Sequence, residues 1–236
     1  MTRRADTLRR GSDAATCVTA CRHTVGGVEA EFAARRAEGA AIACAPGCTF
    51  CCHQRVSVYA HEAIALLSRL CALASRAVAE AIEARISANA SAVDGMTVEQ
   101  HRAANLPCAF LIDGRCAAYD VRPLACARYH SLSRARCEHA FEHPEDVGTP
   151  RNARPVLAEL QTFASSFEAA TEAALGEAGL SVAKGELHQV LRALLESPSL
   201  VERWSAGEDI AAISGDAARA ARTRAGAGAL TPSSTP

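Results

Sequence analysis

The sequence is poor in aromatic residues, which make up only 4% of the chain although 49% of its residues are hydrophobic. Much of the apolar fraction is alanine, which favours helix but buries little area per residue. Strand patterns are also scarce, and the two candidates are Val56–Tyr59 and Ala109–Ile112. We therefore predict a mainly α fold: a small helical domain with irregular cysteine-rich loops and at most a short hairpin.

The sequence also lacks an excess of charge of either sign and has no long apolar runs. The formal net charge is -1, so no basic field favours nucleic acid. Polar residues interrupt every apolar run well before the ~20 residues of a membrane span. The charged start, Met1–Arg10, is not followed by the apolar stretch of a signal peptide. These absences predict a cytoplasmic protein without a nucleic-acid or membrane partner.

Familiar catalytic motifs are absent from the sequence. It has no phosphate-binding glycine loop, no serine nucleophile elbow and no His-Glu-x-x-His zinc helix. Its carboxylates are scattered over the faces of predicted helices. The sequence leaves an enzymatic role open but favours a binding protein.

Cysteine is the abundant exception, with 11 residues. An odd number without an export signal argues against a disulfide framework. The first cluster reads Cys44-Ala-Pro-Gly-Cys48-Thr-Phe-Cys51-Cys52, and its Pro-Gly turn can gather sulfurs around one metal. Adjacent side chains diverge, so either Cys51 or Cys52 is not a ligand, or the site holds more than one metal ion.

The second cluster contains Cys108, Cys116 and Cys126, with Cys137 beyond it. An Asp-Gly turn should fold Cys108 toward Cys116. A helix opening at Pro123 would place Cys126 in its first turn, where free N–H groups favour the thiolate. The surrounding arginines should balance thiolate charge; they are Arg115, Arg122, Arg128, Arg134 and Arg136.

Both clusters should meet in one region and bind zinc or an iron–sulfur cluster through irregular metal-binding loops. The predicted ligands are Cys44, Cys48, Cys51, Cys52, Cys108, Cys116, Cys126 and Cys137. Cys71 lies on the apolar face of a predicted helix and is expected in the core. Cys17 and Cys21 could share a helix face, and their role stays open. His53 and His130 are expected at the surface or beside the ligands.

Four regions are predicted along the chain. They are a partly disordered leader (1–27), a cysteine-cluster domain (28–143), a helical extension packing on it (144–224) and a disordered tail (225–236). The predicted helices cover 28–41, 61–90, 97–102, 123 to beyond 137, 156–176, 183–196 and 199–223.

The spacing Cys44-x3-Cys48-x2-Cys51-Cys52, followed by His61-Glu62-Ala63 opening a helix, resembles the YkgJ-like (CxxCxxCC) cysteine-cluster family. The second cluster matches as well, through Pro107-Cys108-x-Phe110-Leu111, Gly114-x-Cys116, Tyr119, Arg122-Pro123 and Cys126. Two positions depart from the family pattern: the first gap has three residues, and Ala127 stands where arginine is common. The resemblance implies zinc or iron chelation over about residues 44–137 and no settled activity.

Two classes of function compete. In a binding protein the metal would stabilise the fold, sense metal or redox state, or be carried. In an iron–sulfur enzyme, Cys44-x3-Cys48-x2-Cys51 would serve as the cluster motif of radical S-adenosylmethionine chemistry. Such enzymes need a partial α/β barrel, whose repeated strand–helix units are not visible here. Similar cysteine clusters accompany protein lysine methylation in flagellin methylases. This sequence has no recognisable glycine-rich cofactor-binding loop that would support such a role.

Overall fold

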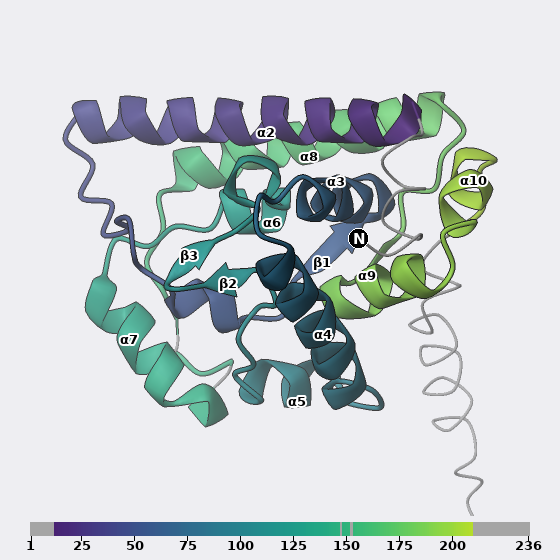
Figure 1. The fold of residues 1–236 in the computed structure, drawn as a ribbon. Coiled ribbons are helices and arrows are strands. Elements are labelled where there is room, and N and C mark those ends of the chain that lie inside the picture. The colour runs from purple at the N-terminus through teal and green to yellow at the C-terminus, as the bar shows by residue number, and fades with distance from the viewer. Residues whose placement is uncertain (1–11, 147, 152, 210–236) are drawn as a thin grey trace, which may run out of the picture.

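The fold is mainly α, as predicted (Figure 1). A computed structural model describes residues 12–146, 148–151 and 153–209. The helices are α2 (Ser12–Ala37), α3 (Ala60–Cys71), α4 (Arg76–Ala92), α5 (Val98–Ala103), α6 (Leu124–Ala127), α7 (Arg134–Glu142), α8 (Ala158–Glu177), α9 (Leu187–Glu196) and α10 (Leu200–Ser205). The strands are β1 (Ser57–Tyr59), β2 (Leu111–Ile112), β3 (Arg115–Cys116) and β4 (Lys184–Glu186).

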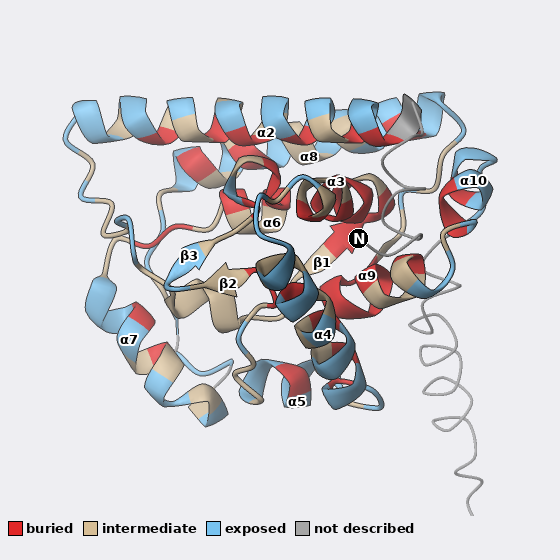
Figure 2. Ribbon diagram, in the orientation of Figure 1, coloured by how far each residue is buried: buried red, intermediate tan, exposed pale blue. Residues whose placement is uncertain are grey.

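The core is centred on α3. Its apolar side chains, including Ile64 and Leu67, are fully buried and belong to one cluster with Leu191 and Leu194 of α9. Helix α2 lies across this layer with α8 behind it (Figure 1). Figure 2 shows that the buried residues of α2 face the layer while its outer side is exposed. This apolar layer packs against Cys108 and Cys116 of the second cysteine cluster.

Helix α2 is much longer than the helix predicted over 28–41. It begins at Ser12, so residues 12–27, which were assigned to the leader, are helical. Two consecutive glycines obscured it in the sequence, because glycine disfavours helix. Packing accounts for one of them: a Cβ at Gly27 would lie 2.5 Å from the Phe167 Cζ atom on α8.

Two predicted helices are each divided in the structure, so both predictions were wrong. The helix predicted over 61–90 stops at Cys71 and restarts at Arg76. The helix predicted from Pro123 past Cys137 is divided into α6 and α7. In both cases a serine begins the second helix: the Ser75 and Ser133 hydroxyls accept backbone N–H bonds three residues on. Such caps compete with helix continuation.

The predicted hairpin is confirmed as β2 paired with β3. Asp113 and Gly114 both have positive φ, 48° and 72°, as a two-residue type I′ turn requires. The strand candidate Val56–Tyr59 is confirmed as β1, but its partner was not predicted: β1 pairs antiparallel with β4, with Ser57 opposite Glu186. β4 occupies the start of the helix predicted over 183–196.

Several helix predictions hold. Thr97 caps α5 as predicted, and α8 matches the helix expected over 156–176. The last predicted helix, 199–223, is represented by α10, and its residues after 209 lie outside the described part of the chain, as do the tail and residues 1–11. Among the described residues no helix has both the length and the apolarity needed to cross a bilayer.

Candidate metal centre

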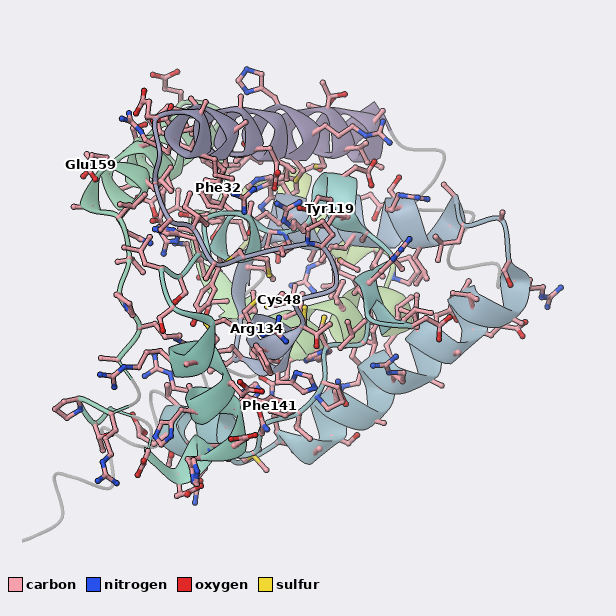
Figure 3. All side chains as sticks on the ribbon, turned by 90° about the vertical axis from the view of Figure 1, so that its left-hand side faces the viewer. Phe32, Cys48, Tyr119, Arg134, Phe141 and Glu159 are labelled. Carbon is pink, nitrogen blue, oxygen red and sulfur yellow. The ribbon has the colours of Figure 1, made fainter. Side chains whose placement is uncertain are left out.

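The two cysteine clusters lie side by side, as the sequence predicts. The backbone N–H of Cys108 donates a 2.8 Å hydrogen bond to the carbonyl of Cys52. Cys52 belongs to a short 3-10 turn, η1 (Phe50–His53), and Cys108 precedes β2. In Figure 3, Cys48 lies toward the middle of the molecule. The chain therefore returns to the first cluster after passing through α3, α4 and α5.

Four thiols form what we call the inner set: Cys51, Cys108, Cys116 and Cys126. Cys126 interacts electrostatically with the other three members. Cys108 also interacts with Cys116, and Cys116 with Cys51. The inner set thus combines one thiol of the first cluster with three of the second.

Three further thiols form the outer set: Cys44, Cys48 and Cys137. Cys44 interacts electrostatically with Cys48, Cys137 and also Cys51. The Cys51 and Cys52 thiols are hydrogen-bonded to each other. All eight predicted ligands therefore belong to one connected group of thiols, in which Cys51 links the inner and outer sets.

The three remaining cysteines are carried by helices α2 and α3. Cys17 and Cys21 are buried on α2, where they interact with each other and Cys21 also with Glu62. Cys71 ends α3 and is half-buried. The prediction of a core position for Cys71 was therefore wrong, because the helix stops there and leaves its last residue at the edge.

Burial and repulsion between neighbouring thiols favour the protonated form of Cys108 and Cys126. Burial raises the pKa of Cys108 to about 11 and that of Cys126 well above its usual range, helped by the neighbouring thiols. The hydrogen bond that the Cys51 thiol donates to Cys52, followed by burial, raises the pKa of Cys51. A cation at the centre would reverse this balance, because metal binding deprotonates cysteine.

Backbone N–H groups are already directed at several of the sulfurs. The Phe110 N–H donates to Cys108 and the Ala118 N–H donates to Cys116, in each case from two residues further along the chain. The Ser131 N–H donates to Cys44. Hydrogen bonds to sulfur stabilise thiolates in metal centres, so the donor set and its surroundings fit a thiolate-bound metal.

The arginines near the thiols are mostly not those predicted from the sequence. Arg85, Arg122 and Arg154 interact with Cys108, Cys116 and Cys51 respectively. Only Arg122 was among the five expected. Arg128 pairs with Glu168, and Arg134 stacks on Phe50. Arg85 and Arg154 lie far from the second cluster in sequence, so no local signal identified them.

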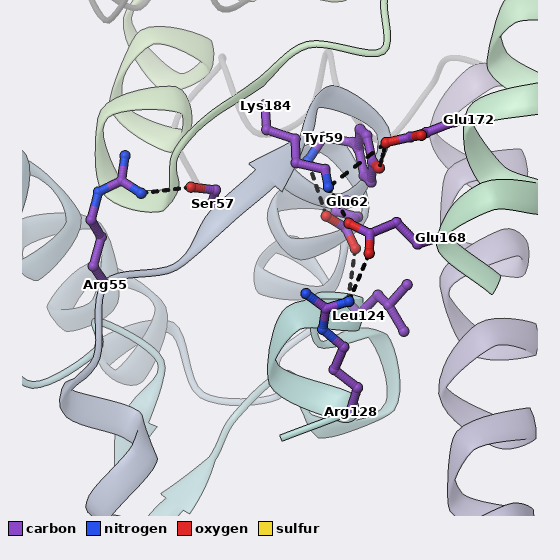
Figure 4. Close-up of polar contacts among 9 residues, drawn as sticks. All are labelled: Arg55, Ser57, Tyr59, Glu62, Leu124, Arg128, Glu168, Glu172 and Lys184. Atoms are coloured by element: carbon purple, nitrogen blue, oxygen red, sulfur yellow. Dashed lines mark hydrogen bonds and ion pairs between the residues drawn. The ribbon is translucent and has the colours of Figure 1, made fainter. Parts of the chain in front are cut away.

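Glu62 connects α3 to the second cluster. Its Oε2 accepts from the Tyr59 N–H at 3.0 Å, closing the start of α3. Its Oε1 accepts from the Leu124 N–H at 2.7 Å, at the start of α6. Figure 4 shows this carboxylate between the two helices. Since Cys126 lies in α6, Glu62 fixes the position of one thiol of the inner set.

Side chains of α4 and α9 hold the loop that carries Cys108. Arg85 donates to the carbonyls of Cys108 and Leu111, both at 2.7 Å. Asn89 donates to the Pro107 carbonyl at 2.8 Å. On the other side, the Ala109 N–H donates to His188 Nε2 at 3.2 Å. The thiol of Cys108 is thus placed by several elements that contain no cysteine of either cluster.

Glu186 orients His188 and gives a testable pH dependence. Burial alone would raise the pKa of Glu186, but its hydrogen bond with His188 and the charges of His188 and His101 hold it below its usual 4.5. A carboxyl whose pKa is lower in the folded protein stabilises it above the unfolded pKa, and this contribution is lost on acidification.

We expect the free energy of unfolding to fall more steeply below about pH 4.5 in the wild type than in Glu186→Gln. Urea unfolding of both proteins over a pH series measures the two slopes. Equal slopes would contradict the assigned role of Glu186.

The two histidines near the clusters have structural roles. His130 is fully buried, so it does not lie at the surface. Its Nε2 accepts from the Leu157 N–H at 2.8 Å, and its Nδ1 contacts the Arg128 carbonyl. His53 packs edge-on against Phe141 with ring centroids 4.8 Å apart. Both therefore support the loops around the thiols.

In the described ranges no three His, Cys, Asp or Glu side chains are already placed as a metal-binding group. Comparison of the chain with protein-family models, with curated proteins and with solved structures finds no match.

Proposed function

We propose that this protein chelates zinc or an iron–sulfur centre through cysteines drawn from both clusters. The observation that carries the proposal is the direct junction of the clusters: Cys108 is hydrogen-bonded to Cys52, and the eight predicted ligands form one connected group. Thiols so gathered suit a soft, thiolate-binding metal. The role would be structural, sensory or in metal and redox handling.

The inner set supplies four thiols, which is enough for one tetrahedral centre. The outer set supplies three, and Cys52 is the fourth candidate there. The Cys51 and Cys52 thiols are hydrogen-bonded to each other instead of diverging as adjacent side chains commonly do, so this pair could join two neighbouring centres. The proposal requires the thiols to rotate about their Cα–Cβ bonds until sulfurs lie near 2.3 Å from the metal.

The surroundings also support the proposal. Backbone N–H groups donate to the sulfurs of Cys44, Cys108 and Cys116 and would stabilise their thiolates. Guanidinium groups near the thiols would balance the negative charge. The resemblance to the YkgJ-like family implies the same chemistry, and a cytoplasmic location would keep the thiols reduced. Strands in the described ranges form two antiparallel pairs, so no observation favours the barrel of a radical S-adenosylmethionine enzyme.

Protein purified without oxygen should contain zinc or iron in at least stoichiometric amount. Elemental analysis measures the metal, and absorption distinguishes the two cases, because an iron–sulfur cluster absorbs visible light whereas a zinc–thiolate site does not. Neither metal above trace levels, together with eight freely titratable thiols in the folded protein, would contradict the proposal.

A further inference from the structure

The hydroxyl group of Tyr129 is buried without a hydrogen-bond partner. Tyr129 follows α6, and its N–H donates to the Cys126 carbonyl. Tyr129 lines an open hollow of about 270 Å³ together with His130 and Arg154. The residue thus borders this hollow while its hydroxyl oxygen is inaccessible to solvent.

Tyr129 lies near both cysteine clusters, because Arg154 stacks on its ring and also reaches Gln54, two residues after Cys52. The ionisable neighbours that act on Tyr129 are Arg154 and then Cys51, Cys137 and Cys44. Arg154 stacks on the ring, with its guanidinium carbon 4.8 Å from the ring centroid, and it also donates to Gln54 at 3.0 Å. Arg154 therefore holds the ring from one side and connects it to the end of the first cluster, so the buried hydroxyl lies in the neighbourhood of Cys44, Cys51 and Cys137.

A neutral thiol is a weak acceptor, whereas a thiolate accepts strongly from a hydroxyl. A buried O–H without a partner costs free energy, and metal-bound thiolates at this position would remove that cost. We propose that Tyr129 donates a hydrogen bond to a metal-bound thiolate of Cys44, Cys51 or Cys137. Tyr129 is thus a positioning residue that tunes the centre; this inference rests on the proposed function.

The test compares Tyr129→Phe with the wild type after loading with Co²⁺, a spectroscopic substitute for zinc. The variant should keep the cobalt stoichiometry, bind about 10-fold to 100-fold more weakly, as is typical for partners of metal ligands, and shift the thiolate-to-cobalt absorption band to longer wavelength. The shift follows because a thiolate without its donor holds its electrons less tightly.

Tyr59→Phe is the matched control. Its hydroxyl is bonded to Glu172 at 2.6 Å, away from the thiols, so cobalt affinity and band position should stay at wild-type values. Thermal melts followed by circular dichroism verify that both variants fold.

The remaining outcomes distinguish failure of this inference from failure of the proposed function. An unchanged band and affinity in Tyr129→Phe would overturn this inference and leave the proposed function standing. Loss of one cobalt equivalent would also overturn it, because the phenol would then be a ligand itself. A wild type that binds no cobalt, zinc or iron would overturn the proposed function and the inference with it.

Discussion

Replacing Cys126 with serine should remove at least one metal equivalent and lower the stability of the protein by several kcal/mol. Serine is a poor ligand for soft metals, and metal binding is linked to folding, with about 10–16 kcal/mol measured for structural zinc in small domains. Cys108→Ser and Cys116→Ser, also in the inner set, should behave in the same way. Metal analysis and urea unfolding measure both effects.

Serine substitutions at the other cysteines distinguish two separate metal ions from a single cluster. If the inner and outer sets hold separate ions, Cys44→Ser and Cys48→Ser should each lose one equivalent and keep the other. Cys51→Ser should affect both, because Cys51 interacts with both sets. A single cluster would instead respond equally to all of them. Cys71→Ser is the control and should keep its metal; metal loss there, or retention in every other variant, would contradict the ligand assignment.

Glu62→Gln should destabilise the protein by about 3 kcal/mol. The carboxylate accepts two backbone N–H bonds in a buried position, and an amide can present an oxygen to only one of them. Hydrogen bonds to charged groups contribute about 1.5–3 kcal/mol, and a buried donor left without a partner costs a further ~1–3 kcal/mol. Metal affinity should fall as well, because Glu62 holds the start of α6.

Urea unfolding of Glu62→Gln beside Glu177→Gln checks this prediction. Glu177 is exposed in the last turn of α8, so its substitution should change stability by no more than about 0.5 kcal/mol. Equal unfolding midpoints for the two variants would show that the Glu62 contacts do not stabilise the fold.

Local signals in the sequence were sufficient for some elements. The Asp113-Gly114 turn fixed the β2–β3 hairpin, and Thr97 marked the start of α5, because these signals act over a few residues. The extension of α2 to Ser12 was not predictable, since its buried face is defined by tertiary packing on other helices, including α3 and α8. The pairing of β1 with β4 joins residues far apart in sequence, which no local pattern indicates.

The same division applies to the candidate site. The grouping of the candidate ligands could be predicted, because cysteine clusters with a turn between them carry their own signal; their binding of a metal stays a prediction. Their supporting residues could not be predicted: Arg85, Arg154 and Tyr129 reach the thiols only through the tertiary fold. Glu62 was visible as part of a family resemblance, but its link to α6 depends on a helix that begins 62 residues later.

The bond between Cys108 and Cys52 has a consequence for how the centre would select its metal. Joining two chain segments at this separation costs loop-closure entropy of roughly 4 kcal/mol, and here hydrogen bonds of the polypeptide offset that cost. A metal ion entering the site therefore has only side chains to order. Such preorganisation leaves more of the intrinsic metal–thiolate free energy available as affinity, and it penalises ions whose preferred coordination differs from the spacing that the loops impose.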